Sequence, residues 1–276
     1  LGLVGSEMCI RDRIFAGLPE IFESEGYDRT SMKLPKCQDR LIEEVLKVQP
    51  NVVVVLHNGS PVELPWADRV SAILEMYLGG QGVGEACDWL LFGEANPSGR
   101  LAETFPYRLE DNPSFLHFPG NEKRVLYGED IFVGYRYYDT KKVPVRYAFG
   151  HGLSYTEFAY GDLTLSSAQM TDEDILTVSL KVKNSGKTEG KEVVQLYVAD
   201  LCGTPERPVK ELKGFAKVHL LPGEEKTVSM EISARNLSYY EERLGDWYAP
   251  SGTYRILIGH ASDDIRLHAD IVFETK

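Results

Sequence analysis

The chain has no long apolar run, no closely spaced cysteines and no excess of positive charge, and each absence excludes a class of protein. No stretch reaches the roughly 18–20 apolar residues that a membrane-spanning helix needs. The cysteines lie far apart without a CxxC pair, which favours free thiols over a disulfide framework or a zinc site. They are Cys9, Cys37, Cys87 and Cys202. Free thiols fit a reducing compartment such as the cytoplasm but leave the location open.

Positive charge is scarce relative to negative charge. The 276 residues include 30 Lys and Arg against 42 Asp and Glu, which gives a formal net charge of −12. Because nucleic acids and membrane surfaces are anionic, we expect neither as a partner and expect neutral molecules instead. The composition, with 43% hydrophobic and 26% charged residues, is that of a globular protein. This length predicts two domains.

The best-known catalytic signatures are also missing. The sequence contains no HExxH, no GxSxG, no Walker A motif and no Cys/His zinc spacing, so we expect no metal and no cofactor. Residues 79–84 are rich in glycine, but no lysine follows at the position that a phosphate-binding loop requires. We interpret this stretch as a tight turn between two helices.

The first half of the chain alternates between strand and helix patterns. Residues 14–17 resemble the end of a strand, and the β-branched run at 52–56 predicts a strand buried on both faces of a parallel sheet. Apolar residues at helical spacing predict helices over 39–48, 67–78 and 83–92. Together these elements predict an α/β fold.

The second half changes to alternation with a period of two. Half-buried strands are predicted wherever apolar and polar residues alternate between turn residues, and several of them in about 110 residues predict a β-sandwich. The runs lie at residues 176–182, 194–198, 228–232, 254–258 and 265–271. Between the two patterns, residues 96–156 are loop-rich and aromatic, and we expect them to lie over the α/β domain. We place the domain boundary near residue 155.

Residues 1–13 have neither helical nor strand periodicity. We expect a non-native leader joined to a real reading frame near Ile14. The predicted organisation is therefore a leader at 1–13, a partial α/β domain with an aromatic connector at 14–155, and a β domain at 156–276.

One loop in the first half is crowded with acidic residues. Four carboxyl groups lie within nine residues, beside Tyr27 and Arg29; they are Glu20, Glu23, Glu25 and Asp28. Crowding and partial burial raise the pKa of a carboxyl group. A carboxylic acid that is still protonated near neutral pH can protonate the leaving oxygen of a glycosidic bond. On this chemistry alone, a solvated acidic surface loop remains the alternative.

Several short motifs follow one another from about Ile14 to the end of the chain. The first half contains Glu23-Ser24-Glu25-Gly26-Tyr27-Asp28-Arg29 with Leu34-Pro35, then Asn58-Gly59-Ser60-Pro61, Asn96-Pro97-Ser98-Gly99-Arg100-Leu101 and Phe149-Gly150-His151-Gly152-Leu153-Ser154-Tyr155. The second half contains Glu192-Val193-Val194-Gln195-Leu196-Tyr197 and Leu212-Lys213-Gly214-Phe215. In this order the motifs resemble glycoside hydrolase family 3, the β-glucosidase family, including its fibronectin type III-like domain.

The resemblance implies an architecture and a set of roles. Family members of this type have a TIM-like barrel, an α/β sandwich and a fibronectin type III-like domain, and this chain resembles the later part of the sandwich and the third domain. The resemblance makes Glu25 the general acid/base, with Glu23 as the alternative because the two glutamates flank Ser24. Asp28 and Arg29 would support the loop. The Asp nucleophile belongs to the barrel, which we expect to be missing from this chain.

The implied function is that of a C-terminal portion of a retaining exo-glycosidase that removes terminal β-D-glucosyl residues. Its partners would be β-linked glucosides or oligosaccharides and the missing N-terminal barrel of the same polypeptide. Two alternatives remain open: a β-xylosidase or α-arabinofuranosidase of the same family, and an inert structural or carbohydrate-binding module. With one of two catalytic carboxyl groups, the isolated chain is expected to be inactive.

Overall fold

The computed structural model describes residues 12–121, 123–204 and 206–275. The described chain forms two compact units. The first contains residues up to 92 together with 105–128, and the second contains 93–104 together with 129–275. Most of the predicted leader lies outside the described residues, but Asp12 and Arg13 are described and already belong to the first strand.

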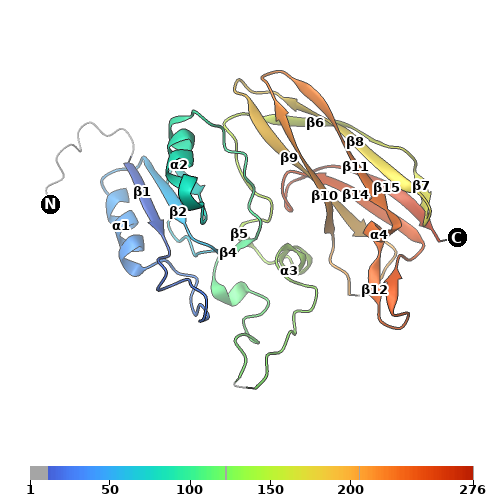
Figure 1. Ribbon diagram of the computed structural model, residues 1–276, viewed down its shortest axis with the longest axis horizontal. Coiled ribbons are helices and arrows are strands. Elements are labelled where there is room, and N and C mark those ends of the chain that lie inside the picture. Colours follow the sequence, from blue (N-terminus) through green and yellow to red (C-terminus); the bar gives the residue numbers. More distant parts are fainter. Residues whose placement is uncertain (1–11, 122, 205, 276) are drawn as a thin grey trace. The chain divides into compact units, whose positions relative to one another are not determined.

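The first unit contains a three-stranded parallel sheet in the order β1-β2-β3 (Figure 1). The strands are β1 (Asp12–Gly17), β2 (Val52–His57) and β3 (Ala72–Glu75). Val54 of the central strand is opposite Ile14 of β1 and Ile73 of β3. Because β2 has a neighbour on each side, most of its side chains are fully buried, as its apolar run predicted.

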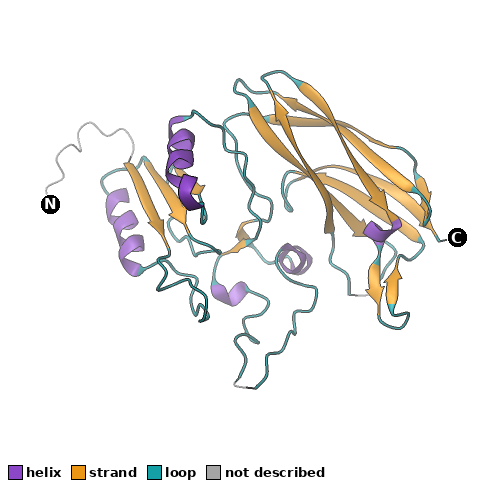
Figure 2. Ribbon diagram, in the orientation of Figure 1, coloured by secondary structure: helices purple, strands orange, loops and turns teal. Residues whose placement is uncertain are grey.

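Two helices accompany this sheet. Helix α1 (Lys36–Leu46) begins directly after Pro35 and buries Ile42, and α2 (Val83–Phe92) matches the predicted range. In the view of Figure 2, strands β1 and β2 lie between the two helices. Gly93, at φ 78°, follows the end of α2, in the left-handed conformation that commonly ends a helix.

The helix predicted over residues 67–78 is wrong. Ala72–Glu75 forms strand β3 instead, and hydrogen bonds from Ser71 N to Val52 O (2.8 Å) and from Met76 N to Leu56 O (2.9 Å) continue its pairing with β2. Pairing with a buried neighbour outweighs the helical spacing of a short apolar run. The glycine-rich stretch that follows includes the 3₁₀ turn η1 (Gly80–Gly82), so it connects a strand to a helix rather than two helices.

The second unit is a β-sandwich. One sheet has the order β10-β9-β14-β15-β7 and the other β11-β8-β6, and strands β12 and β13 form a separate hairpin. The strands are β6 (Phe158–Leu165), β7 (Gln169–Thr171), β8 (Ile175–Asn184), β9 (Gly190–Asp200), β10 (Glu211–Leu220), β11 (Glu225–Ser233), β12 (Tyr239–Glu241), β13 (Asp246–Tyr248), β14 (Gly252–Gly259) and β15 (Ile265–Glu274). All five predicted runs are strands, and their apolar side chains form the core between the sheets.

The shorter elements complete the chain. They are β4 (Phe105–Pro106) and η2 (Leu109–Asp111) in the first unit, and α3 (Tyr135–Lys141), β5 (Val145–Tyr147) and α4 (Ala234–Leu237) in the second. Within the described residues, no helix combines the length and the apolar character that crossing a bilayer requires. Cys37, Cys87 and Cys202 are free thiols, as predicted, and Cys9 lies outside the described residues.

The aromatic connector does not lie wholly over the α/β unit, contrary to expectation. Residues 93–104 and 129–155 belong to the compact unit of the β-sandwich. Helix α3 shows the reason, because the Tyr135 hydroxyl accepts a hydrogen bond from Leu212 N at 2.7 Å and the Tyr135 ring contacts Tyr197 edge to face. The Tyr135 side chain thus packs against strands that the sequence pattern assigns to the next domain.

Candidate active site

The acidic loop follows β1 and leaves the sheet at the carboxyl end of its parallel strands, where ligand sites of open α/β sheets commonly lie. Gly17 ends β1, and the Gln38 side chain of α1 binds both of its backbone groups. The Gly17 N–H donates to Gln38 Oε1, and the Gly17 carbonyl accepts from Gln38 Nε2, each at 2.9 Å. Leu18 N donates to His57 O, the last residue of β2, at 3.0 Å. The start of the loop is therefore fixed to both neighbouring elements.

Glu23 points back from the loop toward the end of β2. Its Oε2 accepts a hydrogen bond from the backbone N–H of Gly59 at 2.6 Å, and its Oε1 accepts one from the Ser60 hydroxyl at 2.5 Å. Only 19% of its side chain is exposed. The carboxylate that the sequence offers as the alternative acid/base is thus occupied on both oxygens.

Glu25 has a different environment. It is exposed, and it forms a turn with Gly26, whose φ of 91° is the left-handed conformation that the third position of a type II turn requires. Open space surrounds the position where a Cβ would stand on Gly26. Among the described residues, no hydrogen bond or ion pair to the Glu25 carboxyl is found. This side chain is therefore open to solvent.

Of the two residues expected to support the loop, Arg29 has partners inside the fold and Asp28 is exposed. The Arg29 Nη1 lies 3.5 Å from Glu23 Oε1 and also donates to the Ser60 hydroxyl oxygen, while Nη2 donates to Pro61 O at 3.3 Å. Glu23 is therefore an ion-pair partner of Arg29.

A second acidic group lies in the other unit, and it has no exposure. Glu192 Oε1 accepts from the Tyr160 hydroxyl at 2.7 Å and lies 2.5 Å from His260 Nδ1, while Oε2 accepts from Arg100 Nη2 at 2.7 Å. Burial raises the pKa of Glu192, but His260, Tyr160 and Arg100 lower it by more, so the carboxyl's pKa lies below its ordinary value. This carboxylate is shielded from any substrate and has a structural role.

The motif that contains Arg100 is fixed to the sandwich by a second residue. Asn96 Nδ2 donates to Glu189 O at 2.8 Å, and its Oδ1 accepts from Tyr155 N at 2.9 Å and from the Ser154 hydroxyl at 3.0 Å. Asn96 and Arg100 thus hold the connector on strand β9 and its preceding turn. The sequence does not reveal the partners of this stretch on the sandwich, because Glu189 lies 93 residues from Asn96 and Glu192 lies 92 residues from Arg100.

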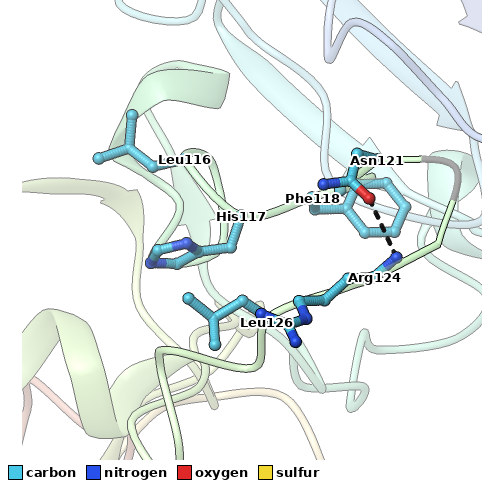
Figure 3. A pocket seen from close by; sticks show the side chains of 7 residues that line it. Leu116, His117, Phe118, Asn121, Arg124 and Leu126 are labelled. Atoms are coloured by element: carbon cyan, nitrogen blue, oxygen red, sulfur yellow. Dashed lines mark hydrogen bonds between the residues drawn. The ribbon is translucent and has the colours of Figure 1, made fainter.

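A hollow of about 320 Å³ lies on the loop that ends the first unit (Figure 3). Its lining consists of Leu116, His117, Phe118, Gly120, Asn121, Arg124 and Leu126. A hydrogen bond from Arg124 N to Asn121 Oδ1, at 3.1 Å, closes the turn at one side. The lining contains no carboxyl group, so it offers no carboxylic acid for glycosidic chemistry. Within the described ranges, no group of His, Cys, Asp and Glu side chains could hold a metal ion.

Comparison with known proteins identifies two domains in the chain. The model of the glycosyl hydrolase family 3 C-terminal domain matches residues 9–155, and that of a fibronectin type III-like domain matches 192–262. Among curated relatives, the thermostable β-glucosidase B of Acetivibrio thermocellus is 56% identical over 258 residues, which cover 94% of this chain and 34% of that protein. A β-glucosidase of Kluyveromyces marxianus is 46% identical over 254 residues, covering 91% of this chain and 30% of the relative.

Solved structures give the same result. The crystal structure of the Kluyveromyces marxianus β-glucosidase in complex with glucose has a TM-score of 0.91 at 42% identity, covering 96% of this chain and 32% of that one. A family 3 β-glucosidase from Bifidobacterium adolescentis has a TM-score of 0.90 at 40% identity, covering 95% and 38%. The chain spans about a third of the length of the relatives it matches. With a family model that matches more than half of its residues, the chain belongs to glycoside hydrolase family 3.

Proposed function

We propose that this chain supplies the general acid/base of a retaining β-glucosidase, and that Glu25 is that residue. The observation that carries the proposal is the contrast within one loop, because Glu25 is exposed at a turn while both oxygens of Glu23 accept hydrogen bonds. The matched relatives are β-glucosidases, which supports a terminal β-glucoside as the substrate.

The chemistry would need a second carboxylate from another part of the enzyme. In the first step that carboxylate attacks the anomeric carbon while the Glu25 carboxylic acid protonates the departing glycosidic oxygen. In the second step the Glu25 carboxylate removes a proton from water, and the resulting hydroxide releases the sugar from the covalent intermediate. Retention requires the two carboxyl groups to lie about 5–5.5 Å apart. Asp28 is exposed in the same loop, and it would support the loop without taking part in the reaction.

The experiment replaces Glu25 by alanine in the full-length enzyme that contains this chain. Loss of general acid/base catalysis lowers the rate by about 10²–10⁴-fold. For aryl glucosides kcat/KM should fall strongly with poor leaving groups and little with activated ones, whose departure needs no proton. With activated substrates kcat should still fall, because the second step has lost its general base. Azide should restore turnover of the activated substrates and give glucosyl azide, because it replaces the water that Glu25 activates. An unchanged rate for poor leaving groups would contradict the proposal.

The isolated chain offers an independent test of the same proposal. With the nucleophile outside the chain, it should show negligible turnover of chromogenic glucosides, and of xylosides and arabinofuranosides that would report another sugar specificity. Robust hydrolysis by the isolated chain would show that both catalytic groups lie within it.

A further inference from the structure

Glu23 and Arg29 form a closed link around the turn that contains Glu25. Their side chains approach to 3.5 Å between Arg29 Nη1 and Glu23 Oε1, and each side chain is 19% exposed. The five residues between them include the Glu25–Gly26 turn. The ion pair therefore joins the two ends of a short loop and limits the positions that Glu25 can take.

This link is attached to the sheet, because the groups that bind the Glu23 carboxylate follow strand β2. Gly59 and Ser60, which receive the Glu23 carboxylate, directly follow the buried Asn58. The Asn58 side chain donates to Ser60 O at 3.0 Å and to the Glu75 carboxylate, at the end of β3, at 3.2 Å. The groups that donate hydrogen bonds to Glu23 thus belong to a segment fixed to the carboxyl ends of β2 and β3.

The geometry also separates Glu23 from proton transfer. Both oxygens of its carboxyl group accept hydrogen bonds within the fold, and Oε1 also faces the Arg29 guanidinium, so the polar atoms of Glu23 are already engaged. A Cβ placed on Gly59 would come within 3.1 Å of the Glu23 carboxyl group, so the carboxylate fits closely against the backbone that binds it.

We propose that Glu23 is a positioning residue. Its contacts with Gly59, Ser60 and Arg29, called the clasp below, fix the loop to the end of β2 and so hold Glu25 in place for proton transfer. This role rests on the proposed function of Glu25. A displacement of about 1 Å in a catalytic group can lower a rate about 10²-fold. Loosening the clasp should therefore reduce kcat without removing any reacting group.

The test compares Glu23→Ala, Glu23→Gln and the matched control Glu20→Ala in the full-length enzyme. Glu20 is an exposed glutamate of the same loop, so its substitution removes the same charge without touching the clasp. We expect Glu23→Ala to lower kcat by about 10- to 100-fold for glucosides with poor leaving groups, with KM nearly unchanged. Glu23→Gln keeps an amide oxygen for Gly59 or Ser60 and should recover a large part of kcat. Azide should not rescue either variant, because Glu25 is still present.

Two outcomes would overturn the proposal, and they differ from those that overturn the role of Glu25. If Glu23→Ala matched Glu20→Ala in kcat, the clasp would have no positioning effect. If azide rescued Glu23→Ala and not Glu25→Ala, Glu23 would itself be the acid/base and the proposed function would need reassignment. Amide hydrogen exchange over residues 18–31 gives a readout that needs no activity: it should become faster in Glu23→Ala and stay unchanged in Glu20→Ala.

Discussion

Glu25 and Glu192 are glutamates of the same chain with opposite surroundings. Glu25 is exposed at a turn, and Glu192 is fully buried with three side-chain partners. A buried carboxylate whose oxygens are all engaged stabilises the fold but cannot meet a substrate, whereas an exposed one contributes little to stability and is available for chemistry. The two glutamates belong to different units of the chain.

The largest difference should appear when each glutamate is replaced by alanine. Glu192→Ala leaves Arg100, only 6% exposed, as an unpaired buried charge, and should lower the free energy of unfolding by about 3–5 kcal/mol. Glu25→Ala removes an exposed side chain and should change it by less than about 0.5 kcal/mol. Urea denaturation of the two variants measures both values. Equal effects would mean that the buried cluster does not stabilise the second unit.

Two glycines sharpen the comparison because both have a positive φ. Gly26 has φ 91° with open space around it, and Gly150 has φ 84° beside the buried Gln195 side chain. Alanine at either position incurs about 1–2 kcal/mol of backbone strain. At Gly150 the new Cβ would also collide with the Gln195 amide, which adds about 1–3 kcal/mol. Thermal or chemical unfolding should therefore rank Gly150→Ala well below Gly26→Ala in stability.

How far the sequence predicts this molecule depends on the range of the interactions involved. The strand at 52–56 follows from a local β-branched run and the helix at 83–92 from a local helical spacing, and the structure confirms both predictions. Strand β3 has four residues, and its state is decided by pairing with β2. A local pattern cannot contain that information, so the helix predicted there is wrong.

The candidate site follows the same rule. The motif around Glu25 identifies it as a candidate from the sequence, and Gly26 indicates a left-handed turn beside it. The hydrogen bonds that Glu23 accepts cannot be predicted in this way, because Gly59 and Ser60 lie 36 and 37 residues further along the chain. Arg100 and Glu192, 92 residues apart, are linked only when the connector folds onto the sandwich.

The effect of acid should also differ between the two units. Burial lowers the pKa of His151 in the second unit, so its protonation favours the unfolded chain as the pH falls below the ordinary histidine pKa of about 6.5. The lowered pKa of Glu192 makes the same unit lose further stability as the pH falls below about 4.5 and through that lowered pKa. Burial raises the pKa of Asp39 in the first unit, with its hydrogen bond from Trp66 opposing in part, so Asp39 takes up a proton more readily in the folded state.

Native-state hydrogen exchange, corrected for the intrinsic pH dependence, measures this difference unit by unit. Between pH 7 and pH 4.5 we expect the protection of β9 to fall relative to that of β2, by less than the loss caused by Glu192→Ala. A His151→Gln variant, which cannot be protonated, should flatten the upper part of this dependence. A uniform loss of protection in both units would contradict the assignment of acid sensitivity to the second.

The smallest effect is expected at an ion pair on the surface of the second unit. Arg255 and Asp270 face each other across β14 and β15, with distances of 2.6 and 2.9 Å and side chains 39% and 43% exposed. This geometry is as close as that of Arg100 and Glu192, but water solvates both charges, so Arg255→Ala should barely change the unfolding midpoint. At 1 M salt, where the Debye length is about 3 Å, the difference from the unsubstituted chain should disappear. If Arg255→Ala were as damaging as Glu192→Ala, contact distance rather than burial would decide the worth of an ion pair, and the contrast between Glu25 and Glu192 would lose its physical basis.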